Sequence, residues 1–349
     1  MTDIPQTMQA LVQLGDGFSG AATGPVIDDA AHWLALKQVP VPVPGEAQVL
    51  IAVRRSSVNP SDLHFIKGEY GQPRVKGQPA GFEGCGDVVV GPKHLIGQRV
   101  AFATSGGAWA EYAVADAASC IPLRPEISDN DGAAQIVNPM TAMAMITMAK
   151  AAGPAVVITA AASQLGKLMI ALAKDLGLVS IAVVRRAESA EALRSLGAGD
   201  VLCTEDADFN EQATQAIAAH KPRMLLDAVC DQTSEALFVQ MPARSVWVSY
   251  GKLSAQAPCL TQMGQFIFMD KRIEGFWLSK WFRTAEPAVQ FDAVRRVQER
   301  FADGRWRTDV SCELPLERAV AELAGATKRR DGKVILTLPL SGMSERPES

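Results

Sequence analysis

The sequence predicts an α/β protein in which a β-rich domain is interrupted by a doubly wound parallel-sheet domain. Three observations support this prediction. The chain has 349 residues, which is long for a single hydrophobic core. Short apolar runs broken by Pro and Gly fill its first third, and strand-like runs alternate with helix-like runs between residues 155 and 250. Such alternation is typical of a parallel sheet covered by helices on both faces.

The first third is expected to form short strands. Strand-like runs at residues 8–14 and 47–58 flank a Pro/Gly-rich breaker at 40–46. Residues 97–116 continue the pattern, with glycines at the turns. We therefore expect a barrel-like or sandwich-like β domain, followed from residue 128 to residue 152 by a capping-type start and a run of good helix formers.

The middle of the chain predicts a series of βα units. The pattern loosens after Arg272, and the chain closes with an expected helix and a strand. We expect one domain from residues 1–130 and 275–340, a second from 131–274, and a polar tail at 341–349. The expected strands are 155–160, 179–184, 200–202, 223–229, 245–250 and 332–339, and the expected helices are 163–177, 188–197, 210–220, 234–241 and 286–304.

The composition predicts a protein that acts on small molecules. The chain is 48% hydrophobic and 21% charged with a net charge of −4, so it lacks the basic surface that nucleic acids and anionic membranes attract. No apolar run approaches the roughly 18 to 20 residues that span a bilayer, and the first residues do not resemble a secretory signal. We expect a cytoplasmic protein. The six cysteines form no C-x-x-C pair, which argues against a zinc ribbon.

The turn after the first strand of the βα series is the expected cofactor site. In a doubly wound sheet, a dinucleotide's pyrophosphate lies against the start of the helix that follows this strand. The turn keeps one glycine of the usual fingerprint and offers a serine hydroxyl as a further donor. A plain turn with an N-capping serine explains the same residues equally well. The expected contacts are Ala162, Ser163, Gln164, Leu165 and Gly166.

The end of the next expected strand indicates which cofactor is preferred. An NAD-specific site carries Asp or Glu there, whereas this chain has Arg185 and Arg186. Guanidinium groups bind a 2′-phosphate bidentately, so we expect NADP(H) in preference to NAD(H). The alternative is a pair of exposed loop arginines with no ligand.

From Met8 to Leu338 the chain resembles the zinc-independent branch of the medium-chain dehydrogenase/reductase superfamily. The resemblance rests on "VPVPVPGEAQVLIAV", "VNPSDL", "PAGFEGCGDVV", "VAFATSGGAWAEYAV", "SLGAGDVL" and "DGKVIL". Within that branch, "VNPSDLHFIKGEYG" and "RIEGFWLSKW" are more similar to trans-2-enoyl thioester reductases than to NADPH:quinone oxidoreductases. The resemblance implies a GroES-like catalytic domain and a Rossmann cofactor domain.

The resemblance also implies that no metal is bound. Zinc relatives take ligands from a Cys where this chain has "VNPSD", from a His where it has Phe82, and from a nearby acidic residue. Catalytic zinc needs three protein ligands, and Glu83 alone cannot hold it. Without this Lewis acid, reduction of an activated C=C bond is easier than oxidation of an alcohol, because negative charge collects on a carbonyl oxygen that protein donors can stabilise.

Several residues are assigned roles through the resemblance. Tyr70 in "KGEYG" matches the proton donor or enolate stabiliser of the enoyl reductases, although a packing tyrosine is the alternative. Asn59 matches a residue near the nicotinamide. Trp109, Phe276 and Trp277 are expected to line the substrate pocket, with core or interface roles about as well supported. Asn138, Thr141, Tyr250 and Gly251 are expected in the cofactor site.

The function expected from these features is NADPH-dependent reduction of an α,β-unsaturated carbonyl compound, with a trans-2-enoyl thioester as the preferred substrate. A quinone reductase is the second hypothesis, and a catalytically weak NADPH-binding protein is the third. Three departures from the family pattern leave the substrate more open than the fold, namely Gln164, "NPMTAM" and "DAVCDQTS". The resemblance also implies a homodimer, formed through a sheet edge near residues 265–276.

Overall fold

The computed structural model describes residues 4–328 and 332–339, and the chain divides into two compact units. Unit 1 contains Met1–Val137 and the chain from Gln298 onward, and unit 2 contains Asn138–Val297. Sequence analysis placed these boundaries at 130/131 and 274/275. The two compact units of the structure divide at 137/138 and 297/298. The expected polar tail at 341–349 lies outside the described residues.

Unit 1 is built on two sheets. A two-stranded sheet pairs β1 with β2, and a seven-stranded sheet has the order β14-β15-β3-β4-β5-β7, with β6 paired to β3. Strand β4 carries the motif "EGCGDVV" through the middle of the larger sheet, where six of its eight residues are buried. The strands are β1 (Thr7–Gln13), β2 (Leu34–Pro40), β3 (Gln48–Val58), β4 (Glu83–Val90), β5 (Arg99–Ala103), β6 (Tyr112–Asp116), β7 (Ile121–Pro122), β14 (Val310–Pro315) and β15 (Lys333–Thr337).

Short helices complete unit 1. Helix α1 (Pro60–Ile66) begins with proline, whose missing N–H costs nothing at that position. The helix-forming run at 128–152 is divided between α2 (Asp129–Ala133), which Ser128 caps, and α3 (Val137–Ala152), a longer helix that belongs to unit 2 from its second residue onward. Helix α11 (Ala319–Ala326) follows β14.

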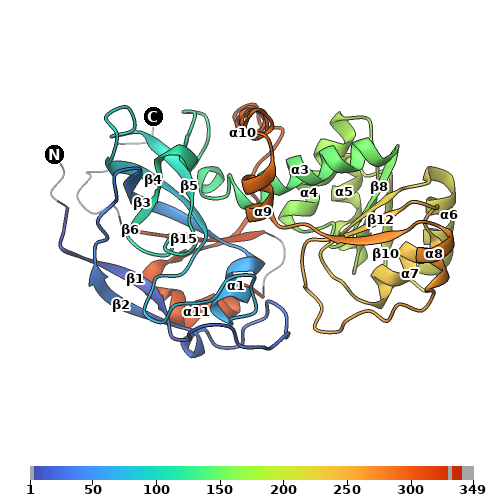
Figure 1. Ribbon diagram of the computed structural model, residues 1–349, viewed down its shortest axis with the longest axis horizontal. Coiled ribbons are helices and arrows are strands. Elements are labelled where there is room, and N and C mark those ends of the chain that lie inside the picture. Colours follow the sequence, from blue (N-terminus) through green and yellow to red (C-terminus); the bar gives the residue numbers. More distant parts are fainter. Residues whose placement is uncertain (1–3, 329–331, 340–349) are drawn as a thin grey trace. The chain divides into compact units, whose positions relative to one another are not determined.

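Unit 2 is a doubly wound parallel sheet of order β10-β9-β8-β11-β12-β13. The order reverses between β8 and β11, which is where such folds bind ligands. Figure 1 shows α4 and α5 on one side of this sheet and α6 and α7 on the other. The strands are β8 (Ala155–Ile158), β9 (Val179–Val184), β10 (Asp200–Cys203), β11 (Met224–Asp227), β12 (Val246–Ser249) and β13 (Arg272–Gly275). The helices are α4 (Gln164–Asp175), α5 (Ala190–Leu196), α6 (Phe209–His220), α7 (Gln232–Gln240), α8 (Gly264–Phe268), α9 (Leu278–Thr284) and α10 (Pro287–Ala302).

Each unit has its own apolar core. The unit 2 core combines alternate residues of the central strands with one face of α6 and α7. In α4, Met169 and Leu172 are buried at a helical spacing, whereas Leu165, expected on the same face, is only partly buried. Among the described residues, no helix is both long enough and apolar enough to cross a bilayer.

Candidate functional site

Phe82, which the resemblance matches to a metal-ligating histidine, packs against the ring of Tyr70. The two ring centroids lie 5.1 Å apart, and the ring of Phe65 lies 4.9 Å from that of Phe82. Tyr70 follows α1 and is half-buried, and its ring meets the edge of Phe65 at 6.4 Å. Apolar aromatic contacts therefore fill the space beside Tyr70 where a zinc ligand would stand.

The carboxylate of Glu83 is fully engaged by hydrogen bonds. Its Oε1 accepts from Ser57 Oγ at 2.6 Å and from Asn59 Nδ2 at 2.9 Å. Its Oε2 accepts from the backbone N–H groups of Ile136 and Val137 at 3.1 and 2.8 Å. Glu83 thus satisfies backbone donors at the start of α3, and neither oxygen has to coordinate a metal.

A buried lysine supplies the positive charge in this cluster. Lys333, at the start of β15, donates to Asn59 Oδ1 and is 5% exposed. Burial lowers its pKa, while the charges of Glu83 and Asp62 raise it in opposition. Burial raises the pKa of Asp62 to about 7, against hydrogen bonds from the backbone N–H groups of Asn59 and Phe82.

This donor set does not fit zinc. Glu83 is saturated, Asn59 accepts from an ammonium group, and Phe82 offers no ligand atom. A dication would also be repelled by the ammonium group of Lys333. Within residues 4–328 and 332–339, no group of three or more His, Cys, Asp or Glu side chains is arranged to hold a metal.

Asn59 and Trp109 are both buried and hydrogen-bonded within unit 1. Asn59 Nδ2 donates to Ser57 Oγ and Glu83 Oε1, its Oδ1 accepts from Lys333, and the residue is 1% exposed. The amide is therefore committed within the protein. Trp109 is fully buried, and its Nε1 donates to Ser57 O at 3.3 Å. It belongs to the apolar core of unit 1.

The expected phosphate turn lies between β8 and α4. Ser163 is the N-cap of α4, and its Oγ accepts from the N–H of Gly166 at 3.1 Å, which leaves the hydroxyl hydrogen free to donate to an anion. A Cβ on Gly166 would lie 2.4 Å from Ala161 O, so the first turn of α4 packs closely against the turn that precedes it only because this residue is glycine. Ala162, Ser163, Gln164 and Leu165 are all partly exposed.

Arg185 and Arg186 follow β9 and are exposed, as a 2′-phosphate site requires. The Arg185 guanidinium lies 3.8 Å from Glu205, which follows β10. No ion pair of Arg186 is recorded among the described residues. Since β8, β9 and β10 run parallel, these side chains and the Ser163 turn lie at the same side of the sheet, where the strands have their carboxyl ends.

The carboxyl ends of β11 and β12 lie on this same side of the sheet, beyond β8. Asp227 is fully buried and accepts from Thr159 Oγ1 at 2.6 Å and from Trp247 Nε1 at 2.8 Å, which ties β8, β11 and β12 together. The buried hydroxyl of Tyr250 has no hydrogen-bond partner within the described chain, and burial raises its pKa. A Cβ on Gly251 would lie 2.9 Å from Ala228 O.

The remaining predicted residues lie in unit 2. Asn138 and Thr141 belong to the first two turns of α3, and Thr141 is buried. Phe276 and Trp277 follow β13 and are half-buried. The ring of Trp277 lies 5.1 Å from the guanidinium carbon of Arg283, so this ring already has a cationic partner.

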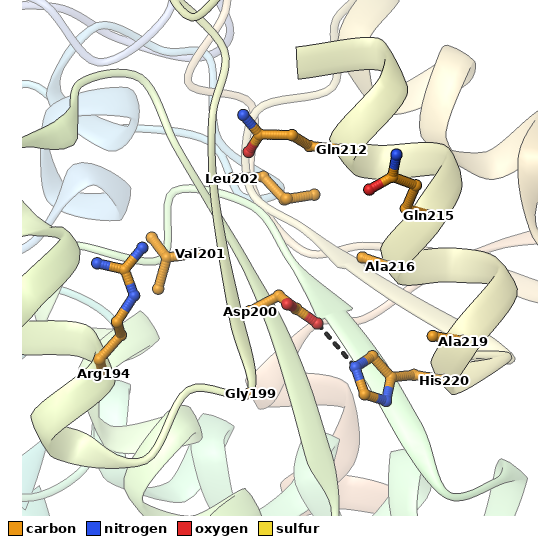
Figure 2. Close-up of a pocket in the computed structure, with 10 residues that line it drawn as sticks. All are labelled: Arg194, Gly199, Asp200, Val201, Leu202, Gln212, Gln215, Ala216, Ala219 and His220. Carbon is orange, nitrogen blue, oxygen red and sulfur yellow. Dashed lines mark hydrogen bonds and ion pairs between the residues drawn. The ribbon is translucent and has the colours of Figure 1, made fainter. Parts of the chain in front are cut away.

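A surface hollow of about 370 Å³ lies elsewhere in unit 2, beside β10 (Figure 2). Asp200 and His220 form its ion pair, with Oδ2 and Nε2 2.7 Å apart. Its lining comprises Arg194 on α5, residues 199–202 at the start of β10, and residues of α6 from Gln212 to His220. It lies toward the amino end of this strand, whereas ligands of doubly wound sheets bind at the carboxyl ends. We do not assign it to the reaction.

Sequence reasoning missed three buried polar residues that organise these sites. Lys333, Asp62 and Asp227 each bond to partners far away in the sequence. One signal was present for Lys333, since "KVILT" begins a buried strand with a charged residue. No local pattern marks Asp62 or Asp227 as central to a hydrogen-bond network.

Known proteins share both units. A family model described as alcohol dehydrogenase GroES-like domain matches residues 45–125, and one described as zinc-binding dehydrogenase matches residues 165–293. The mitochondrial enoyl-[acyl-carrier-protein] reductase of Bos taurus is 27% identical over 322 residues, which cover 89% of this chain and 86% of that protein.

Solved structures agree with this assignment. A candidate NADPH:quinone reductase from Mesorhizobium loti is 46% identical, with a TM-score of 0.92 over 96% of this chain and 99% of that one. The mitochondrial 2-enoyl thioester reductase heterodimer from Candida tropicalis shares the fold at 21% identity, with a TM-score of 0.77 over 95% and 99% of the two chains. The expected GroES-like and Rossmann-type domains are confirmed, and the chain belongs to the medium-chain dehydrogenase/reductase superfamily of oxidoreductases.

Proposed function

We propose that this protein reduces the activated C=C bond of an α,β-unsaturated carbonyl compound, preferably a trans-2-enoyl thioester, with NADPH. The observation that carries the proposal is the packing of Phe82, at the position of a metal ligand, against the ring of Tyr70. The site offers an aromatic hydroxyl in place of a Lewis acid. Protonation and enolate stabilisation require such a donor, whereas alcohol oxidation by this family's zinc chemistry requires the metal.

The carboxyl edge of the unit 2 sheet fits NADP(H). Ser163 and the first N–H groups of α4 offer donors to a pyrophosphate, and Gly166 allows the close approach of helix and strand. Arg186 offers an exposed guanidinium to a 2′-phosphate, and Arg185 offers a second one that Glu205 partly neutralises. The unpartnered hydroxyl of Tyr250 lies on the strand end that borders the same edge. These features support NADP(H) in preference to NAD(H).

The reaction divides between the cofactor and the chain. When held by the Ser163 turn and Arg186, NADPH would supply the hydride that adds to the β-carbon of the substrate. The C=C electron pair moves toward the carbonyl oxygen and forms an enolate, which needs a hydrogen-bond donor. Tyr70 supplies that donor and the proton that reaches the α-carbon, and solvent reprotonates its hydroxyl. Asn59 and Lys333 act indirectly: Asn59 donates to the Glu83 carboxylate, and Lys333 donates to Asn59.

A quinone reductase is the second candidate, favoured by the 46% identity to the Mesorhizobium loti protein of that name. Reduction of a quinone places both added protons on oxygen, so it does not require a donor to carbon. Loss of the Tyr70 hydroxyl therefore separates the two reactions.

The test offers the purified, metal-stripped protein NADPH with crotonyl-CoA or with a simple quinone. We expect turnover of the enoyl thioester, a fall of about 10²- to 10⁴-fold in Tyr70→Phe, and a selective rise of the NADPH KM over the NADH KM in Arg186→Ala. Turnover of the quinone alone, unchanged in Tyr70→Phe, would favour the second candidate. NADPH binding without turnover of either acceptor would reject both.

We also propose a homodimer. Strand β13 forms an edge of the unit 2 sheet, and all four of its residues are exposed. Ile273 on this strand and Ile267 and Phe268 on α8 are apolar side chains exposed by 42%, 72% and 84%. Edge strands and contiguous apolar surfaces are normally covered in a stable protein.

The free cysteines, three of them buried, support a reducing, cytoplasmic location.

A further inference from the structure

The loop that carries Tyr70 is held by a cluster of charged side chains directly before the tyrosine. The side chain of Glu69 is 1% exposed. Its Oε2 accepts from the backbone N–H of Thr23 at 3.0 Å, and its Oε1 accepts from Thr23 Oγ1 at 2.6 Å. Lys67 Nζ lies 3.3 Å from Oε1, and His64 Nδ1 lies 3.4 Å from Oε2.

Lys67 completes the connection to the segment at residues 23–26. Its Nζ donates to Thr23 Oγ1 at 2.6 Å, to Gly24 O at 2.5 Å and to Val26 O at 3.2 Å. Thr23 Oγ1 therefore accepts from the lysine and donates to the glutamate. The hydrogen bonds and the Coulombic attraction act together to lower the pKa of Glu69, against the effect of burial. The carboxylate stays ionised at neutral pH.

Residues 17–19, which precede that segment, are hydrogen-bonded to the Tyr70 loop through their backbone. Ser19 N donates to Gly68 O at 3.0 Å, and Gly17 and Arg74 exchange two backbone hydrogen bonds of 3.0 and 3.2 Å. The Arg74 guanidinium packs against both Gly15 and Gly68. A Cβ on Gly15 would lie 2.3 Å from its atoms, and a Cβ on Gly68 would lie 2.8 Å from them. The tyrosine is thus fixed by contacts before it, at Gly68 and Glu69, and after it, at Arg74.

We infer that Glu69 is a positioning residue for the reaction and acts through Tyr70, an inference that rests on the proposed function. A donor must be held within about 0.5 Å of its productive place to accelerate a reaction, and an unsupported loop does not achieve this. An apolar contact would bury the same area without desolvating two charges, whereas buried ion pairs are retained in some proteins for conformational specificity. The Glu69–Lys67–Thr23 cluster fixes the backbone of the residue that precedes the donor.

The test is a double-mutant cycle on crotonyl-CoA reduction with Glu69→Gln, Tyr70→Phe and the variant that carries both. We expect Glu69→Gln to lower kcat by about tenfold with little change in KM, because orientation matters most in the transition state. In the Tyr70→Phe background the same substitution should change kcat by less than about twofold, since no hydroxyl remains to be oriented. An additive cycle would overturn the inference.

Two further variants guard against a general loss of structure. Thr23→Val keeps the shape of the side chain but removes the hydroxyl that joins Glu69 to Lys67, and it should lower kcat about threefold even where Glu69→Gln folds poorly. Asp87→Asn breaks another partly buried ion pair of unit 1, in which Asp87 accepts from Arg54 at 2.6 and 3.0 Å, and should lower the urea midpoint with unchanged kcat.

The outcomes separate the two proposals. Wild-type turnover in Tyr70→Phe would reject the proposed role of Tyr70, and the positioning role with it. A large loss in Tyr70→Phe combined with wild-type kcat in both Glu69→Gln and Thr23→Val would leave the proposed function standing and reject the inference. An equal loss of kcat in Asp87→Asn would also reject it, because the effect would then follow stability rather than orientation.

Discussion

At the scale of single residues, a buried lysine belongs to the hydrogen-bond cluster around Glu83. The ammonium group of Lys333 and the carboxylate of Glu83 are both buried, and Asn59 joins them through its amide. Taking either charge out of water is unfavourable, and mutual attraction together with full hydrogen bonding offsets that cost. The cluster therefore depends on both partners being present.

Lys333→Met should lower the free energy of unfolding by about 3 to 5 kcal/mol, because it leaves Glu83 buried without a counter-charge. The measurement is the urea midpoint of the purified protein. Lys271→Met is the matched control, since Lys271 is also buried but, within the described residues, its ammonium group donates to two backbone carbonyls, those of Phe238 and Val239. Burial lowers the Lys271 pKa to about 8, so neutralising this residue should cost less. A loss in Lys333→Met no larger than in Lys271→Met would contradict the account.

At the scale of elements, the turn from β8 to α4 depends on close packing rather than on a full glycine fingerprint. Ala160 adopts a φ of +47°, a conformation that usually favours glycine, and Gly166 lies against the carbonyl of Ala161. The expected strand 155–160 stops at Ile158 because the chain turns at Ala160. This left-handed residue turns the chain from β8 toward the N-terminus of α4.

Gly166→Val should displace the first turn of α4, because its Cβ would come within 2.4 Å of a backbone oxygen that cannot move aside. We expect the NADPH dissociation constant, measured by fluorescence titration, to rise at least tenfold. Gly177→Val, at the far end of the same helix, is the control for helix stability, because its Cβ would meet no atom within 4 Å, although its φ of +65° adds strain. Equal NADPH binding in Gly166→Val and wild type would show that the turn does not hold the phosphates.

The sequence predicted elements well where local pattern and burial agree. The expected strand 179–184 coincides with β9, and the expected helix 210–220 differs from α6 by one residue. Strand β4 was missed because glycines interrupt it and both faces are buried, so it shows no alternation. The Lys333–Asn59 contact joins residues 274 positions apart, and no local signal in one sequence reveals such a pairing.

At the scale of the whole molecule, the exposed edge of unit 2 decides the proposed oligomeric state. Strand β13 is hydrogen-bonded to β12 on one side, and the strand order ends there. Ile267, Phe268 and Ile273 would remain in water in a monomer. Burying such side chains yields about 25 cal/mol per Å² of apolar area, which favours association of two identical edges across a two-fold axis.

Phe268→Glu should therefore convert a dimer into a monomer, because association would bury a carboxylate without a partner. Light scattering coupled to size-exclusion chromatography measures the mass, for which the chain predicts 37.2 kDa per subunit. Phe291→Glu is the matched control, since Phe291 is 73% exposed and lies on helix α10, which is not part of the β13 edge strand. This substitution should leave the mass unchanged. A wild-type protein that already elutes as a monomer, or a Phe268→Glu variant that keeps the dimer mass, would place the subunit contact elsewhere.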